Sequence, residues 1–213
     1  MVDLGCGTGQ LALQLAPFFD RCIGIDPERD MLREAEIVAR ERELANLEWL
    51  EGSSADLPEL EPIDLVTIGT AFHFMEPRAT LQALRTRLTE DGAVAVAYNG
   101  SPMWLQPNRW ARALRGVLEE WFGPLRDLDI AVEGIEAAER ALQELGYRDI
   151  ERWERVYEDE VDADFVVGHI FSALSPDQVQ PSRRSEFAHA MANVLPTGTF
   201  SESVAVRAVV GRP

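Results

Sequence analysis

Three glycines at alternate positions, Gly5, Gly7 and Gly9, follow the short apolar run Met1–Leu4 and precede a segment of helical period. Glycine is needed where a backbone turns sharply or approaches a ligand closely, because it has no Cβ. Amides at the start of a helix can also bind an anionic group. The segment VDLGCGTG (2–9) therefore predicts a ligand-binding loop between a strand and a helix.

Two acidic residues stand at later strand ends. Asp26 follows the apolar run Cys22–Ile25, where a carboxylate can bind both hydroxyls of a ribose. The segment Gly52–Pro58 places Asp56 after a third apolar run, where it can accept a hydrogen bond from an adenine amino group. Because the carboxyl ends of parallel strands meet at one edge of a sheet, these groups and the glycine loop are predicted to face one crevice.

Short apolar runs alternate with segments of helical period, which is typical of a parallel sheet covered by helices on both faces. The strands are expected at Met1–Leu4, Cys22–Ile25, Leu47–Glu51, Ile63–Gly69, Ala93–Tyr98, Asp149–Tyr157 and Ser203–Val210. The helices are expected at Gln10–Ala16, Asp30–Leu44, Pro77–Leu88, Trp110–Trp121, Ile135–Leu145, Phe165–Leu174 and Arg183–Leu195. We predict a single domain, 1–213, with a cofactor-binding half, 1–98, and a substrate-side half, 99–213, that carries helical cover segments.

These motifs resemble the class I S-adenosylmethionine-dependent methyltransferases, in particular the small-molecule, methyltransferase type 11-like branch. The resemblance is carried by DLGCGTG, GID, DLP and AFH, and it is close over about residues 2–98. It implies a doubly wound, Rossmann-like α/β fold with a seven-stranded mixed sheet in the order 3-2-1-4-5-7-6. The last strand would be antiparallel, and a helical insertion would lie over the active site.

The resemblance also implies S-adenosyl-L-methionine as cofactor and assigns residues to it. The glycines would wrap the methionine part, Asp26 would bind the ribose, and Thr70 would line the methionine side. The nucleoside would meet Met31, Ala55 and Asp56. The complete set of expected cofactor-binding residues is Asp3, Gly5, Cys6, Gly7, Gly9, Asp26, Pro27, Met31, Ala55, Asp56 and Thr70.

The sequence departs from the family pattern at two places. It starts within the first strand, so we expect the chain to be a shortened form that binds cofactor less tightly than an extended one, or to be covered by another subunit. The segment Gly69–Met75 also lacks the N/D-P-P-Y/F motif of many amino-group methyltransferases. That absence argues against methylation of a base or amide nitrogen.

His73 follows the fourth predicted strand, and its imidazole titrates near neutral pH. It is the candidate catalytic residue, taking a proton from an acceptor hydroxyl or carboxyl group. The alternative is that it only shapes the pocket.

Two other functional classes stay open. The segment Gly7–Ala12 also satisfies the G-x-G-x-x-G/A fingerprint of a nicotinamide-dependent Rossmann oxidoreductase. A non-catalytic cofactor-binding domain is the second alternative. Asp3, two residues before the first glycine, and the acidic motifs in register favour methyl transfer to a small molecule.

Composition limits the partners. Lys and Arg total 20 against 37 Asp and Glu, a formal net charge of −17, so nucleic acid is a poor partner. No apolar run reaches the ~18 to 20 residues that cross a bilayer, and the start of the chain lacks signal-peptide features. Two cysteines, Cys6 and Cys22, are too few for a disulfide framework. We expect a cytoplasmic monomer or homodimer that uses a small-molecule acceptor and no metal.

Overall fold

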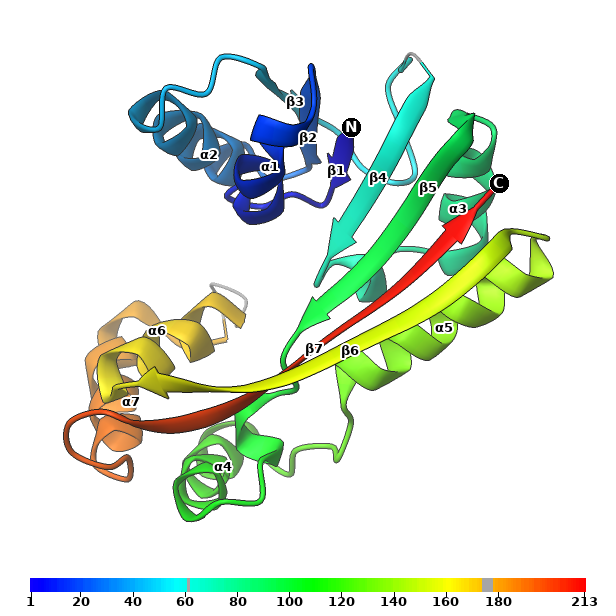
Figure 1. Cartoon of the computed structure of the whole chain (residues 1–213). Helices are drawn as coiled ribbons and strands as arrows, with labels where there is room; N and C mark the ends of the chain where they lie inside the picture. The colour runs from blue at the N-terminus through cyan, green and yellow to red at the C-terminus, as the bar shows by residue number, and fades with distance from the viewer. Residues whose placement is uncertain (61, 174–177) are drawn as a thin grey trace. The chain divides into compact units, whose positions relative to one another are not determined.

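The computed structural model describes residues 1–60, 62–173 and 178–213. One mixed sheet of seven strands has the order β3-β2-β1-β4-β5-β7-β6 (Figure 1). The strands are β1 (Val2–Leu4), β2 (Cys22–Asp26), β3 (Leu47–Glu51), β4 (Ile63–Gly69), β5 (Leu88–Asn99), β6 (Arg148–Val161) and β7 (Phe200–Arg212). The first five strands pair in parallel and β7 pairs antiparallel with β5, so the predicted order and the antiparallel last strand are confirmed.

Seven α-helices accompany the sheet in the described part of the chain. They are α1 (Gln10–Leu15), α2 (Arg29–Glu41), α3 (Pro77–Arg85), α4 (Arg109–Phe122), α5 (Ile130–Glu144), α6 (Ala163–Ala173) and α7 (Arg184–Ala192). None of these helices is both long and apolar enough to cross a bilayer. Position 174, the expected end of α6, lies outside the described residues.

The chain divides into two compact units. The first comprises Met1–Asn99, Ile130–Arg155 and Val206–Pro213, and the second comprises Gly100–Asp129 and Val156–Ala205. The long strands β6 and β7 contribute residues to both units. Because Ile130–Arg155 contains α5, this helix belongs to the first unit, together with the glycine loop and the first five strands.

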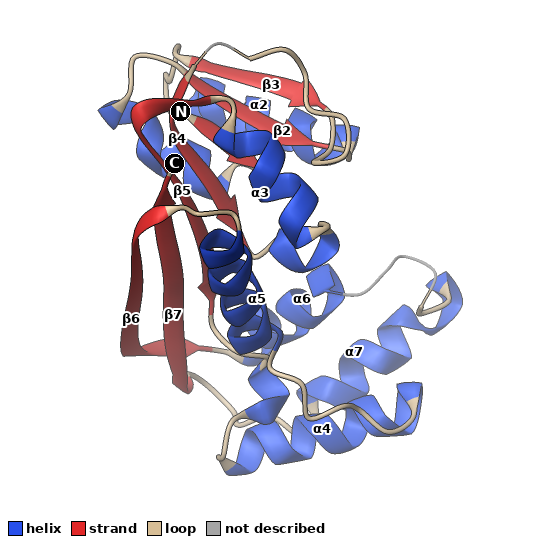
Figure 2. Ribbon diagram, turned by 90° about the vertical axis from the view of Figure 1, so that its right-hand side faces the viewer, coloured by secondary structure: helices blue, strands red, loops and turns tan. Residues whose placement is uncertain are grey.

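Successive side chains of a strand point to opposite faces of the sheet, so the contacts of β1 show which helices cover each face of the first unit. Val2 and Leu4 of β1 lie in one buried cluster with Leu81 of α3 and Ala138 of α5. Figure 2 shows α3 and α5 side by side against the sheet. Asp3 points the other way, where its carboxylate accepts a hydrogen bond from a backbone amide of α1. Helix α1 therefore lies on the opposite face from α3 and α5, as a doubly wound fold requires.

The fifth strand is longer than its apolar core predicts. We expected a strand over Ala93–Tyr98 and a helix ending at Leu88, whereas β5 begins at Leu88 and α3 ends at Arg85. Leu88 pairs with Ile63 of β4, and the register between the two strands shifts directly after Ile63. A polar stretch with a glycine is thus held in the sheet by its partner strand, which local sequence patterns do not show.

The second unit has an apolar core of its own. Its centre is Phe187 of α7, which is fully buried and meets the rings of Trp121, Phe122 and Phe171 at centroid distances of 4.8, 5.4 and 5.5 Å. The buried apolar residues of α4, among them Trp110, Leu114 and Leu118, belong to the same core.

Candidate functional site

The loop after β1 is built by its three glycines. Gly5, Gly7 and Gly9 have φ values of 72°, 53° and 78°, in the left-handed region that side chains disfavour. The amides of Gly5 and Cys6 both donate to the carbonyl oxygen of Ile25, at 2.8 and 3.1 Å. The loop is therefore tied to the end of β2.

The three glycines differ in what surrounds them. A Cβ at Gly5 would lie 2.6 Å from the Cβ of Ala71, and one at Gly9 would lie 2.5 Å from the ring of Trp49. A Cβ at Gly7 would meet nothing within 4 Å. Gly5 and Gly9 are thus required by packing, whereas Gly7 borders open space in which a ligand can lie against the backbone.

Asp26 stands at the edge of this open space. It is 8% exposed, its Oδ2 accepts from the Gly7 amide at 2.8 Å, and its Oδ1 accepts from the Glu28 amide at 2.9 Å. A carboxylate offers about four acceptor positions, so each oxygen can accept one further bond. Asp26 therefore holds the glycine loop and can also take a pair of hydroxyl donors. Pro27 follows it and is exposed.

The loop after β3 starts beside Asp26. The Gly52 amide donates to the Asp26 carbonyl oxygen at 3.2 Å, and Ser53 forms an isolated bridge with Asp56. Ala55 and Asp56 are exposed on this turn, and Met31, on the first turn of α2, is 46% exposed. The loops after β1, β2 and β3 thus adjoin through backbone hydrogen bonds, and the expected nucleoside contacts present free side-chain surface there.

Thr70 directly follows β4 and has a strained conformation. Its φ of 51° is unfavourable for a β-branched residue, and it is held by its amide, which donates to Ala97 at 2.7 Å. Its hydroxyl accepts from the Asn99 amide at 3.4 Å. Strain of this kind is retained where the surroundings enforce it, often at functional sites. The next residue, Ala71, is the one packed against Gly5, so this turn adjoins the glycine loop.

His73 lies in the 3₁₀ helix η2 (Phe72–Phe74), directly after this turn. The residue is exposed, and its ring centroid lies 3.9 Å from that of Phe74 and 6.0 Å from that of Tyr98. Partial burial of the ring lowers the pKa of His73, which favours a neutral imidazole near neutral pH.

Asp3 and Cys6 point away from the open space. Asp3 is 2% exposed, and its carboxylate accepts from the Thr67 hydroxyl at 2.7 Å and from the Ala12 amide at 3.2 Å. Burial, together with the charges of Asp3 and Asp26, raises the pKa of the Cys6 thiol, which keeps it protonated. The Cys6 Sγ lies 3.0 Å from where a Cβ at Gly24 would be. Both side chains therefore pack against the protein interior and stabilise the loop on the side away from the open space.

Burial of the Asp3 carboxylate makes stability depend on pH. Burial raises its pKa from 3.8 to about 6, against the hydrogen bonds from Thr67 and Ala12. The protonated Asp3 carboxyl therefore makes its full contribution to the free energy of unfolding below pH 3.8, and this contribution is lost as the pH rises through about 6.

We expect Asp3→Asn to remove this dependence. The free energy of unfolding of Asp3→Asn, measured relative to that of the natural chain in urea titrations, should increase by about 2 kcal/mol between pH 4.5 and 7.5. Asp64→Asn is the matched control, because Asp64 is exposed and also accepts from a threonine, Thr89. An advantage for Asp3→Asn that is the same at both pH values would contradict this account of Asp3.

Sequence reasoning missed Trp49, which covers the loop from β3. Trp49 pairs with Gly24 of β2, and a Cβ at Gly24 would lie 2.4 Å from its ring. The ring crosses Gly24 and reaches Gly9, 2.5 Å from the Cβ position there. A glycine inside a strand signals a close approach of this kind, but it does not name the partner.

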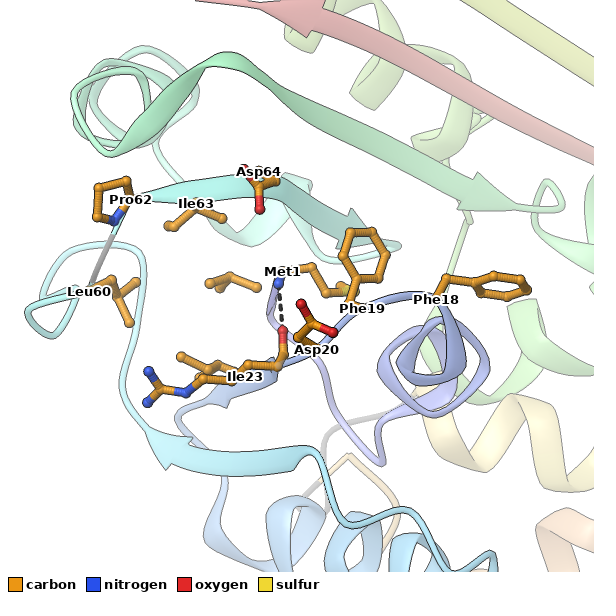
Figure 3. Close-up of a pocket in the computed structure, with 11 residues that line it drawn as sticks. Met1, Phe18, Phe19, Asp20, Ile23, Leu60, Pro62, Ile63 and Asp64 are labelled. Atoms are coloured by element: carbon orange, nitrogen blue, oxygen red, sulfur yellow. Dashed lines mark hydrogen bonds between the residues drawn. The ribbon is translucent and has the colours of Figure 1, made fainter.

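A hollow of about 380 Å³ lies elsewhere, at the amino ends of β1, β2 and β4 (Figure 3). Phe18, Phe19, Leu60 and Ile63 are among its lining residues. Ligands of open α/β sheets bind outside the carboxyl ends of the strands, so the glycine loop and not this hollow is the candidate cofactor site. Among the described residues, no group of three or more His, Cys, Asp or Glu side chains could hold a metal ion.

The comparisons with known proteins agree with this geometry. A family model described as a methyltransferase domain matches residues 1–92. The "Probable S-adenosylmethionine-dependent methyltransferase CRG1" of Saccharomyces cerevisiae is 34% identical over 98 residues, which are 45% of this chain and 34% of the yeast protein. The uncharacterized methyltransferase YcgJ of Bacillus subtilis is 27% identical over 161 residues, which are 72% of this chain and 59% of YcgJ. The chain thus spans between about a third and three fifths of these relatives.

Solved structures share the fold. The crystal structure of YcgJ matches with a TM-score of 0.59 at 17% identity, covering 99% of this chain and 90% of that one. A Geobacter sulfurreducens methyltransferase in complex with S-adenosyl-L-homocysteine matches with a TM-score of 0.55 at 15% identity, covering 100% and 83%. Residues 1–92 thus match a methyltransferase domain in sequence, and the chain as a whole shares the strand order 3-2-1-4-5-7-6 and the fold of these methyltransferase structures.

Proposed function

We propose that the chain transfers a methyl group from S-adenosylmethionine to a small-molecule acceptor. The observation that carries this proposal is the open space beside Gly7, bordered by the buried carboxylate of Asp26 at the carboxyl ends of β1 and β2. An amino-acid moiety can lie against a backbone that has no Cβ, and the two oxygens of a carboxylate can accept hydrogen bonds from the two hydroxyls of a ribose. The residues present therefore fit the cofactor of the family.

The loops after the first four strands would divide the cofactor between them. In this proposal Gly5, Gly7 and Gly9 wrap the methionine part and Asp26 accepts from the ribose hydroxyls. The nucleoside lies against Pro27, Met31, Ala55 and Asp56, and Thr70 borders the methionine side. Asp3 and Cys6, which point into the protein, keep the loop in shape without a side-chain contact to the ligand.

Positioning would supply most of the rate enhancement. Bound S-adenosylmethionine supplies an activated sulfonium methyl group that is open to in-line displacement. Holding donor and acceptor in near-attack geometry can contribute up to about 7 to 11 kcal/mol in favourable systems. The strained turn at Thr70 and the η2 turn that follows it would hold His73 on the acceptor side. A small acceptor agrees with the net charge of −17, which repels nucleic acid phosphates.

Calorimetry tests the proposed cofactor binding, and a turnover assay then tests the proposed methyl transfer. We expect the chain to bind S-adenosylhomocysteine with one-to-one stoichiometry and to release it from S-adenosylmethionine when a suitable small acceptor is supplied. Binding of a nicotinamide dinucleotide in place of S-adenosylhomocysteine would instead identify an oxidoreductase. Binding without turnover across a broad panel of hydroxyl, carboxyl and amine acceptors would identify a non-catalytic cofactor-binding domain.

A further inference from the structure

Tyr98 of β5 is buried directly behind His73. It is 1% exposed, and its hydroxyl oxygen lies 3.4 Å from the Nδ1 atom of His73. The two residues come from neighbouring strands, since η2 follows β4 and Tyr98 stands one residue before the end of β5. The inner edge of the imidazole is therefore engaged by a group that cannot move into solvent.

Helix α5 leaves space for this tyrosine at one glycine. A Cβ at Gly134 would lie 2.2 Å from the Tyr98 hydroxyl oxygen and 2.3 Å from its Cζ atom. Glycine inside a helix is unfavourable relative to alanine, and φ at Gly134 is not in the left-handed region, so helix geometry does not require it. The space that the Tyr98 ring needs explains the glycine, and the packing fixes the hydroxyl in place.

The direction of the hydrogen bond follows from what the hydroxyl can reach. Leaving the proton of a buried hydroxyl unpaired costs free energy. In residues 1–60, 62–173 and 178–213, the hydrogen-bonding partner of the Tyr98 hydroxyl is His73. Burial raises the pKa of Tyr98, so the hydroxyl keeps its proton near neutral pH. Nδ1 of His73 is the acceptor that lies within reach of this proton, so we infer that the hydroxyl donates to Nδ1.

A hydroxyl that donates to Nδ1 determines where the neutral ring carries its proton. Nδ1 must then be the unprotonated nitrogen, and the proton must lie on Nε2. A ring in this state has no free lone pair with which to accept a proton, and it presents an N–H donor on the side away from Tyr98.

We propose that Tyr98, held against Gly134, positions His73 as the Nε2-protonated tautomer, so that His73 donates a hydrogen bond to the methyl acceptor instead of removing its proton. This rests on the proposed methyl transfer. It implies an acceptor atom that arrives deprotonated, such as a carboxylate oxygen. The oxygen then uses its own electron pair to form the new bond to the methyl carbon, the electrons of the broken bond return to sulfur, and no proton has to leave.

Nitrogen-15 NMR on the unliganded chain tests the tautomer directly. The chain has three histidines, and His73→Gln identifies the signals of His73. Above the pKa of His73 we expect Nδ1 to show the chemical shift of an unprotonated nitrogen and Nε2 that of an N–H. A proton found on Nδ1 would overturn the proposal.

Tyr98→Phe tests the partner, because it removes the hydroxyl and keeps the ring. Donation to Nδ1 stabilises the neutral imidazole, so its loss should raise the pKa of His73 in the same NMR titration. A pKa of His73 that falls or does not change would overturn the proposal. Gly134→Ala should raise the pKa in the same direction, because its Cβ displaces the hydroxyl.

Tyr147→Phe is the matched control. Tyr147 is also buried, and its hydroxyl donates to the carbonyl oxygen of Leu81 at 2.7 Å, away from His73. We expect this variant to leave the His73 signals unchanged. The NMR titration uses no cofactor, so its result does not depend on whether the chain binds S-adenosylhomocysteine. In calorimetry, we expect the cofactor affinity of Tyr98→Phe to lie within twofold of that of the natural chain.

Discussion

Asp26→Ala is expected to weaken S-adenosylmethionine binding by about 2 to 4 kcal/mol, because two hydrogen bonds from ribose hydroxyls to a charged acceptor are lost together. This corresponds to a rise in Kd of roughly 30-fold to 900-fold. The substitution also frees the Gly7 and Glu28 amides, which donate to this carboxylate at 2.8 and 2.9 Å, so the loop loosens in the same variant. Calorimetric titration measures the change, with thermal unfolding to show that the variant is folded.

Asp30→Ala is the control for the charge change. Asp30 lies four residues further along, in the first turn of α2, and its side chain is 88% exposed. We expect it to change the affinity by less than a factor of about two, as surface positions usually do. If Asp26→Ala had as small an effect as Asp30→Ala, the ribose would have to be held by another residue.

A pair of alanine substitutions in the glycine loop should separate folding from binding. In Gly9→Ala the new Cβ would lie 2.5 Å from the Trp49 ring at a φ of 78°. A left-handed conformation costs about 1 to 2 kcal/mol for a residue with a Cβ, and overpacking costs about 1 to 3 kcal/mol more. We therefore expect the free energy of unfolding to fall by about 2 to 5 kcal/mol in urea titrations.

Gly7→Ala should behave in the opposite way. Its Cβ meets nothing within 4 Å, so only the backbone cost at a φ of 53° remains, about 1 to 2 kcal/mol. The same Cβ enters the space that we assign to the cofactor, and we expect the Kd for S-adenosylhomocysteine to rise at least about tenfold, or 1.4 kcal/mol. A Gly7→Ala variant that keeps its affinity would show that the ligand does not approach this backbone.

Much of the first unit can be predicted because its signals are local. Alternate glycines after an apolar run, an acidic residue after the next one and a third polar turn all lie within short windows of sequence. Their spatial relation follows from one rule, since the carboxyl ends of parallel strands meet at one edge. The confirmed strand order agrees with this reasoning.

The supporting contacts could not be predicted because they depend on register and helix packing. Trp49 covers Gly9 only because β2 and β3 pair with Gly24 opposite Trp49. Tyr98 lies beside His73 where β4 and β5 end together, and its ring has space there because α5 carries a glycine at position 134. A glycine in a strand or a helix marks a close approach, but its partner lies far away in sequence.

The role of Asp3 shows the same limit. Its place before the first glycine suggested a cofactor contact, whereas the structure points its carboxylate at Thr67 and at the Ala12 amide of α1. The alternation of β1 is enough to place Asp3 on the face opposite Val2 and Leu4. It does not show that an amide of α1 would donate to that carboxylate.

A crystal structure of the chain with S-adenosylhomocysteine would test the proposed cofactor site most directly. We expect ligand density against the Gly7 backbone, with both ribose hydroxyls within hydrogen-bonding distance of the Asp26 carboxylate. Density at another place, such as the hollow beside Phe18 and Ile63, or a ribose away from Asp26, would contradict this proposal.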